Sequence, residues 1–445
     1  MTTGNPIKLI LQFSLPVLLG NILQQLYNLA DGVIVGQILG AEALGAVGAT
    51  TSVQFLVMGF CIGICTGFAI PVAKEFGAGS ESSMRHYIYN AGILTAFFAI
   101  LMTGLTVVLC KQILILLQVP DSMFADAYSY LVIIFAGIPF TMLYNLLAGF
   151  LRAVGDSRTP FMFLIISTFL NILGDILCIV VFHMGCAGAG IATVVAQIIS
   201  GFLCLMLIIK KYTVLHIQPS ERHFKSNTAK RLVIMGVPLG LQFSITAIGS
   251  MVMQTANNSL GNLYVSAFAA SMKIKQFALC PYDAIGTAVS MFAGQNLGAG
   301  KFDRVKTGIK TGVLIALCYG LLAGTIMNVF GHDLLYLFIQ RGQDAVADTG
   351  YKYIYYLSFF YWCLGLLIVC RMSIQGLGHA SRTLISGAIE MVARIIVCTF
   401  FVTYYGFTAI CFADQCAWIF ATLYCGIVLI KIVKDLPNKM NPIQA

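Results

Sequence analysis

Charged residues are scarce in this chain. Asp, Glu, Lys and Arg make up 10% of its 445 residues, whereas 59% are hydrophobic and the mean hydropathy is +0.90. Soluble globular proteins carry about 25% charged residues, so the composition excludes that class. Many apolar runs exceed about 18 residues, the length at which a helix crosses a bilayer. The sequence therefore predicts an all-α polytopic membrane protein.

Histidine is also rare, and groupings that hold metals or disulfides are missing. His183 and His332 lie at the ends of predicted spans, and His216, His223 and His379 lie in loops. This placement disfavours an intramembrane enzyme, which needs a histidine or metal constellation, so we predict no catalytic residue. The 14 cysteines stand mostly singly inside apolar runs, which is typical of small apolar side chains rather than of a disulfide framework or metal site.

Basic clusters outside short loops are missing too. The formal net charge of +9 therefore does not point to a nucleic-acid partner, and we read it as topology information instead. The first apolar run is too long for a signal peptide and has no small-residue cleavage site, so we expect this helix to be retained.

We expect twelve transmembrane helices, each of about 20 to 28 residues, enough to cross about 30 Å of hydrocarbon. The predicted spans are 12–38, 46–70, 88–110, 126–150, 160–182, 188–210, 232–258, 265–292, 310–331, 350–372, 383–405 and 408–430. With the amino terminus inside, the inner segments hold 20 Lys and Arg residues and the outer loops hold 2. The positive-inside rule then places both termini in the cytoplasm of a multi-pass plasma (inner) membrane protein.

The two halves of the chain repeat each other at an offset of about 221 residues. The sequence at 76–79 returns at 297–300, and the polar, basic segment 211–231 falls between the halves. Six spans in each half make the repeat parallel, which is the arrangement of transporters with two lobes around a central cavity. The sequence predicts two six-helix lobes, an amino-terminal one at 1–210 and a carboxy-terminal one at 232–445, joined by a cytoplasmic linker at 211–231.

A proline occupies the same place in both halves. Pro16 lies early in the first span and Pro238 early in the seventh. Because proline removes a backbone donor and kinks a helix, two readings are open. Each proline either gives the span a static curve or lets it bend as the cavity changes.

Two acids lie deep in the predicted membrane region of the amino-terminal half. Asp31 and Asp175 each precede the outer end of a span by about seven residues, so both lie roughly 10 Å below that boundary. Asn171 shares a helix face with Asp175, and Thr193 reaches a similar depth from the next span. An ionised carboxylate at this depth is costly unless it is paired or hydrated. The four side chains therefore predict a cation-coupling site that binds a shared proton or Na⁺.

The carboxy-terminal half does not repeat the acid pair. Its intramembrane charges are Lys273, Lys275, Asp283, Glu390, Arg394 and Asp414. Glu390 and Arg394 are four residues apart, so we favour a structural ion pair between them. For Lys273 and Lys275 two alternatives are open, because these side chains either line the cavity or extend toward the outer surface.

The predicted central cavity is rich in Met, Phe and Tyr, which re-pack around varied apolar ligands. This is weak support for a broad substrate range. We expect five residues to line the substrate cavity: Gln24, Asn28, Gln254, Lys275 and Tyr282.

Three motifs resemble the multidrug and toxic compound extrusion (MATE) family. They are LYNLADGVIVGQILG at 26–40, LRAVGDSRTP at 151–160 and GQNLGAGKFDRVK at 294–306, and the resemblance covers nearly the whole chain. It implies export of cationic or amphipathic compounds driven by inward H⁺ or Na⁺. In one branch of the family the cation site maps onto Asp31, Asn171, Asp175 and Thr193. The seventh span lacks the acid that another branch has there, since Gln254 or Asn257 stands at that place, which makes a carboxy-lobe cation site doubtful.

The sequence therefore predicts a secondary active multidrug antiporter that exchanges its substrates for H⁺ or Na⁺. It is not expected to be an enzyme, to need a cofactor other than the coupling ion, or to bind nucleic acid, and we expect it to act as a monomer in the lipid bilayer. A lipid-linked precursor flippase shares this general architecture and is the alternative. A flippase would need a cationic cavity for pyrophosphate, for which the candidates are Lys273, Lys275 and Arg394.

Overall fold

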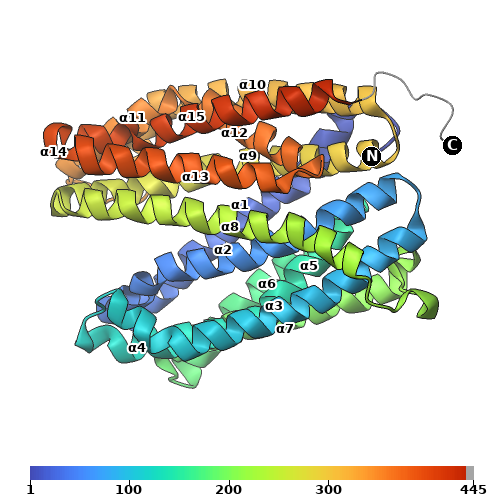
Figure 1. Cartoon of the computed structure of the whole chain (residues 1–445). Helices are drawn as coiled ribbons and strands as arrows, with labels where there is room; N and C mark the ends of the chain where they lie inside the picture. Colours follow the sequence, from blue (N-terminus) through green and yellow to red (C-terminus); the bar gives the residue numbers. More distant parts are fainter. Residues whose placement is uncertain (437–445) are drawn as a thin grey trace. The chain divides into compact units, whose positions relative to one another are not determined.

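The computed structural model describes residues 1–436, and every regular element in that part of the chain is a helix (Figure 1). This confirms the all-α prediction. The first half holds α1 (Pro6–Ile38), α2 (Ala41–Gly77), α3 (Glu81–Leu116), α4 (Asp121–Ala136), α5 (Ile138–Ala153), α6 (Arg158–Asp175), the π-helical segment η1 (Ile176–Val181) and α7 (Gly185–Lys211). Residues 437–445, which the sequence assigns to the carboxy-terminal lobe, lie outside the described residues.

The second half repeats this order and adds one short helix, α14 (Val402–Tyr405), after its π-helical segment. It holds α8 (Ser226–Asn258), α9 (Asn262–Gly298), α10 (Phe302–Leu335), α11 (Asp344–Ser358), α12 (Tyr361–Gly376), α13 (Ala380–Ile396), the π-helical η4 (Val397–Phe401), α14 (Val402–Tyr405) and α15 (Phe407–Lys434). The matching helices agree in length: α1 and α8 have 33 residues each, and α2 and α9 have 37 each. A π-helical segment follows α6 and α13 at the same place in each copy. The repeat seen in the sequence is therefore a repeat of structure.

Glycines at the turns explain why the copies start and stop alike. Gly40 precedes α2 with φ 94°, and Gly261 precedes α9 with φ 113°. Both angles lie in the region that residues with a Cβ rarely adopt, so only glycine makes this turn without strain. The short Leu-Gly pairs at 39–40 and 260–261 therefore mark the same corner in both halves.

The helices account for the twelve expected spans, with two corrections. Among residues 1–436, 9 helices are long and apolar enough to cross a membrane, and two bent pairs raise the number to 11. The remaining helix, α9, is equally long but carries Lys273, Lys275 and Asp283. The predicted spans 126–150 and 350–372 are not single straight helices. The first bends by 45° between α4 and α5, and the second by 57° between α11 and α12.

The break between α4 and α5 has a simple cause. Pro139 is the second residue of α5, and its ring nitrogen cannot donate to a preceding carbonyl. Gly137 sits at the bend, and a Cβ there would meet the Val194 side chain at 2.4 Å. The Gly-Ile-Pro sequence at 137–139 therefore ends one helix and starts the next.

The chain packs as two compact units. The amino unit is Leu19–Gly240, and the carboxy unit is Met1–Leu18 together with the chain from Leu241 onward. The division expected from the repeat, 1–210 and 232–445, follows chain order instead, and as a statement about domains it stays a prediction. Helices α1 and α8 each pass from one unit to the other. Pro16 and Pro238 lie within α1 and α8 just before those crossings.

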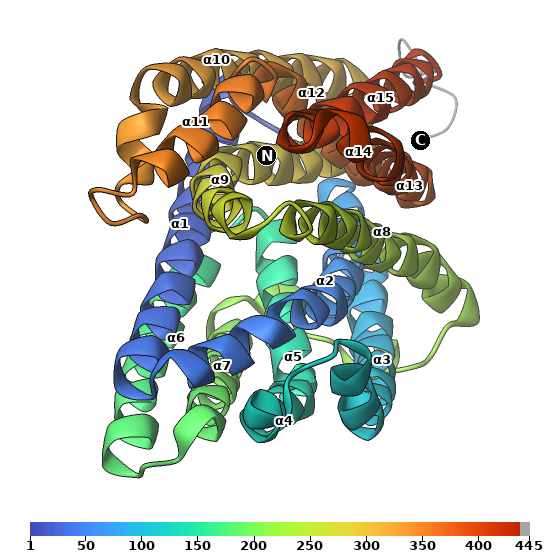
Figure 2. The same ribbon diagram turned by 90° about the vertical axis from the view of Figure 1, so that its left-hand side faces the viewer.

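Within each unit the helices pack side by side, as the view along their axes in Figure 2 shows. In the amino unit α2 lies against α3, α4 and α5, and α7 lies against α4, α5 and α6. In the carboxy unit α9, α10 and α12 pack together, and α15 lies against α11, α12 and α13.

The basic segment between the halves is fastened to α3. Glu221 is buried, and its carboxylate accepts a hydrogen bond from the Arg85 guanidinium at 2.8 Å. The Asn90 side-chain oxygen accepts the backbone N–H of Lys225 at 3.0 Å. The predicted linker 211–231 thus has fixed partners within the amino unit, as well as two short 3₁₀ turns at Thr213–Leu215 and Pro219–Glu221.

Glycines let α2 and α8 touch backbone to backbone inside the amino unit. A Cβ on Gly67 would lie 2.5 Å from the Gly236 Cα, and a Cβ on Gly63 would lie 2.6 Å from the Gly240 Cα. The pairs Gly63/Gly67 and Gly236/Gly240 are each four residues apart, which is the small-xxx-small pattern of close membrane helix packing.

We expect Gly67→Ala to destabilise the protein by about 1–3 kcal/mol, because the added methyl group forces the two helices apart. The midpoint of thermal unfolding in detergent measures this effect. Gly92→Ala is the matched control, because Gly92 also lies inside a long helix and a Cβ there meets nothing within 4 Å. Equal midpoints for the two variants would contradict the close contact.

Candidate functional site

The candidate site lies in the amino unit, on α1, α6 and α7. A cap at the start of α6 helps to hold it in place, because Asp156 Oδ1 accepts the backbone N–H groups of Arg158 at 2.9 Å and Thr159 at 3.1 Å. Its second oxygen accepts the Tyr212 hydroxyl. Burial raises the pKa of the Asp156 carboxyl, but the hydrogen bonds from Thr159 and Tyr212 outweigh it and hold that pKa below its usual value. The cap is therefore charged, as suits the positive end of a helix.

The four residues predicted as a cation site lie together. Asn171 donates a hydrogen bond from Nδ2 to Thr193 Oγ1 at 3.1 Å. Asp175 is one helical turn beyond Asn171 and is 0% exposed. The carboxyl groups of Asp31 and Asp175 lie within interaction range of each other. The structure thus brings α1, α6 and α7 together at one polar cluster.

The cluster is rich in acceptors and poor in donors. Five buried oxygens receive no hydrogen bond from any residue in the described range 1–436: Asp31 Oδ1, Asp175 Oδ1, Asp175 Oδ2, Asn171 Oδ1 and Gln197 Oε1. A buried acceptor without a donor costs about 1–3 kcal/mol, so five in one place require an explanation. A bound proton or small cation supplies one, since it gives these oxygens what the protein does not.

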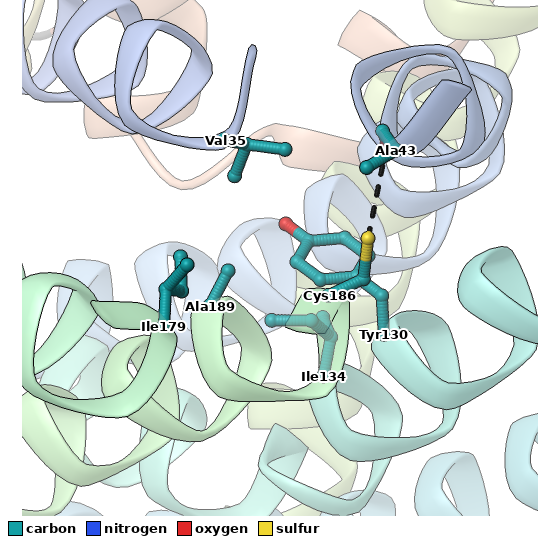
Figure 3. Close-up of a cluster of buried hydrophobic side chains, with 7 residues drawn as sticks. All are labelled: Val35, Ala43, Tyr130, Ile134, Ile179, Cys186 and Ala189. Carbon is teal, nitrogen blue, oxygen red and sulfur yellow. Dashed lines mark hydrogen bonds between the residues drawn. The ribbon is translucent and has the colours of Figure 1, made fainter. Parts of the chain in front are cut away.

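A cluster of buried side chains, here called the apolar cap, follows the two acids along α1 and η1 (Figure 3). It consists of Val35, Ala43, Tyr130, Ile134, Ile179, Cys186 and Ala189. Val35 follows Asp31 by four residues, and Ile179 follows Asp175 by four. The cap therefore lies about one helical turn from the carboxylates, toward the end of α1 that leads into α2.

A small polar pocket lies beside the cluster. Its walls are Gln24, Tyr27, Leu164, Ser167, Thr168, Asn171, Thr193, Ala196 and Gln197. The space holds about one water molecule, which suits a proton carrier or a small ion rather than a drug-sized compound.

Six of the nine pocket residues were not predicted, and three of these six, Tyr27, Ser167 and Gln197, are polar residues on the helix faces of predicted ones. The Tyr27 hydroxyl lies 3.1 Å from Thr193 Oγ1, and Gln197 carries one of the acceptors without a donor. Tyr27 precedes Asp31 by four residues and Gln197 follows Thr193 by four, so extending each helix face by one turn could have found both. Ser167 lies eight residues before Asp175, two turns away on the same face.

The five residues expected to line a substrate cavity fall into two groups. Gln24, Asn28 and Gln254 are exposed, and Gln24 also lines the polar pocket. Tyr282 is 0% exposed, and its hydroxyl donates to the Tyr361 carbonyl at 2.7 Å. Lys275 is 7% exposed. In this structure Tyr282 and Lys275 are therefore interior packing residues of the carboxy unit.

Lys275 belongs to a buried charge network centred on Asp414. Lys275 Nζ donates to the Asp414 carboxylate, Arg394 Nε donates to it at 3.0 Å, and the Tyr353 hydroxyl donates to it at 2.7 Å. Lys275 thus follows neither of the two alternatives left open by the sequence, whereas Lys273 is exposed.

The ion pair expected between Glu390 and Arg394 is present, with 3.4 Å between Glu390 Oε2 and Arg394 Nη2. Arg371 also donates to Glu390. In the carboxy unit three cations, Lys275, Arg371 and Arg394, thus share the two carboxylates of Asp414 and Glu390, whereas the amino unit holds a pair of acids.

Comparisons with known proteins agree with this architecture. The sequence model of the family described as MatE matches residues 16–177 and matches again at 238–400, once in each repeat. The chain is 34% identical over 416 residues to "Probable multidrug resistance protein YpnP" of Bacillus subtilis (strain 168), covering 92% of this chain and 89% of that protein. It is 24% identical over 395 residues to "FAD transporter" of Shewanella oneidensis, covering 87% of this chain and 86% of that protein.

A solved structure described as the outward-facing conformation of a multidrug resistance MATE family transporter has the same fold. Its TM-score is 0.92 at 20% identity, and 98% of both chains is covered. Because the family model matches both repeats and a relative is 34% identical over nearly the whole length, this chain belongs to the MatE family, the multidrug and toxic compound extrusion family that its motifs resemble.

Proposed function

We propose that this membrane transporter is an antiporter that exports cationic or amphipathic compounds in exchange for H⁺ or Na⁺, with the Asp31–Asp175 cluster as the coupling site. One observation carries the proposal. Two carboxyl groups lie together in a buried part of the amino unit, and three of their oxygens receive no hydrogen bond from residues 1–436. Two neighbouring carboxylates cannot both stay ionised there without a compensating cation.

Asn171 and Thr193 fit the same role. Asn171 gives its N–H to Thr193, which leaves the amide oxygen free and directed away from that bond. With the two carboxylates, it forms a set of oxygens that accepts a proton on one carboxyl or holds Na⁺ between several ligands. Thr193 also contacts the Tyr27 hydroxyl, so it links α6 and α7 to α1.

Helix α1 connects the cluster in the amino unit with the carboxy unit. Asp31 lies on the part of α1 that belongs to the amino unit, whereas residues 1–18 belong to the carboxy unit. Loading a cation removes the repulsion between Asp31 and Asp175 and so changes how α1 packs on α6. Coupling then needs only that cation and substrate prefer different states of the transporter.

The proposal places both termini in the cytoplasm, which the strong excess of Lys and Arg in the inner segments supports, and it includes a monomeric protein. The names of relatives such as the Bacillus multidrug resistance protein support broad export of drug-like compounds. The flippase alternative receives less support, because Lys275 and Arg394 are already paired with Asp414 and Glu390.

Export by the cell corresponds to uptake into the lumen of everted membrane vesicles. We expect vesicles that contain the protein to accumulate a fluorescent organic cation when the lumen is more acidic than the medium or holds more Na⁺ than the medium. The two gradients are imposed separately, each with the other collapsed, because either ion fits the oxygen cluster. Uptake that follows one gradient identifies the coupling ion. Uptake that needs neither gradient would contradict the antiport proposal, and vesicles without the protein are the control.

A further inference from the structure

An exposed acid lies at mid-length on α9, where no function has been assigned to it. Asp283 is roughly 20 Å from the nearer end of this 37-residue helix, at the depth of the hydrocarbon core. Its side chain is exposed, as is that of Gln276, which lies seven residues earlier on the same face. A carboxylate exposed to lipid at this depth costs several kcal/mol. This face of α9 therefore borders a water-filled pathway.

Asp283 has no bonded partner of its own. In the range 1–436 it makes no hydrogen bond or ion pair, and Arg371 is the cation within its electrostatic range. Arg371 uses Nη2 to donate to Glu390 and to Ser386 Oγ, the latter at 3.1 Å. Its Nε is buried and has no acceptor in that range. An acceptor without a donor thus lies near a donor without an acceptor.

The neighbouring charges do not fill this gap. Lys275 and Arg394 are both committed to Asp414, and Glu390 is shared between Arg371 and Arg394. Arg371 therefore shares its one carboxylate partner, Glu390, with Arg394, while Asp283 has no ion-pair partner among residues 1–436. Both groups are left able to take another partner.

We propose that Asp283 binds the positively charged group of a transported compound, such as an ammonium or a delocalised organic cation, and that Arg371 competes with this cation for Asp283. The inference rests on the proposed function, which supplies a cationic substrate. When the substrate is bound, Asp283 faces it from the side of α9 that carries Gln276 two turns earlier. When the substrate leaves, Asp283 turns to Arg371 Nε, which satisfies both groups and favours release.

The test is equilibrium binding of two fluorescent compounds of similar size to the purified full-length protein, one a monovalent organic cation and one uncharged. We expect Asp283→Asn to weaken binding of the cation at least about tenfold, because the variant loses a charge-assisted contact. Binding of the uncharged compound should change less than about twofold. Asp283→Glu should restore cation binding, and Asp333→Asn, which neutralises an exposed acid at the far end of α10, is the control.

The outcomes separate this inference from the coupling proposal. Unchanged cation binding by Asp283→Asn, or an equal loss for both compounds, overturns the subsite while leaving the Asp31–Asp175 site as it was. Selective loss of cation binding supports the subsite even if vesicle uptake proves independent of any ion gradient. Arg371→Lys keeps a charge beside Glu390 but removes Nε, so it should tighten cation binding several-fold, and unchanged or weaker binding removes Arg371 as the competitor.

Discussion

Replacing either acid of the Asp31–Asp175 pair with asparagine is expected to reduce gradient-driven export to the level of vesicles that lack the protein. An amide has nearly the volume of a carboxylate, so the helices keep their packing. The amide cannot take up a proton or contribute a negative charge to Na⁺ binding, so the cation gradient no longer drives transport. The acid that remains cannot share a cation with an amide, and the other side chains of the cluster, Asn171, Thr193 and Gln197, are neutral.

Three variants test whether the two acids act as one site. Asp31→Asn, Asp175→Asn and the double variant are compared in everted vesicles under the gradient that drives the wild-type protein. Two groups that share one cation lose their function together, so the double variant should be no worse than either single variant. Asp121→Asn, an exposed acid at the start of α4 in the same unit, is the matched control.

Binding measurements locate the defect. Substrate binding in the absence of any gradient should persist in Asp31→Asn, because the pocket beside the oxygen cluster is too small for a drug-sized compound. Export by Asp31→Asn at the wild-type rate, with the same dependence on the gradient, would remove Asp31 from the coupling role. Loss of both binding and folded protein would instead indicate a structural acid.

The polar cluster was within reach of the sequence because helix geometry is regular. Asp31 and Asp175 lie at matching depth in two spans that run the same way, and a rise of 1.5 Å per residue turns that spacing into a shared level. Asn171 follows from the same rule, since it lies one turn from Asp175. The inventory of helices was predictable for a similar reason, as each apolar run had to be long enough to cross the bilayer.

The sequence could not predict contacts that depend on how the helices are oriented toward each other. Nothing in the local sequence relates Lys275 to Asp414, which lie on α9 and α15 and are brought together only by tertiary packing. The bend at 359–360 is a second example, because that site has neither proline nor glycine to announce it. The turn from α4 to α5 differs, since Gly137 and Pro139 were visible and only their effect was missed.

Replacing Asp414 with asparagine is expected to cost about 3–5 kcal/mol of stability, the typical effect of breaking a buried ion pair. Asp414 is 0% exposed and accepts hydrogen bonds from Lys275, Arg394 and Tyr353. The amide removes the one negative charge that Lys275 contacts, and both cations stay buried. We expect a large fall in the thermal unfolding midpoint, while Asp333→Asn changes it little.

A paired variant distinguishes lost charge balance from lost shape. Lys275→Met together with Asp414→Asn removes one buried cation along with the anion, and Arg394 keeps Glu390 as its partner. If uncompensated charge causes the damage, the double variant should be more stable than Asp414→Asn alone, even though it carries one substitution more. If the double variant is less stable than both Lys275→Met and Asp414→Asn, Asp414 acts through packing and its hydrogen bond with Tyr353. The network would then be a rigid core of the carboxy unit, in which the charges matter less than the shape they fill.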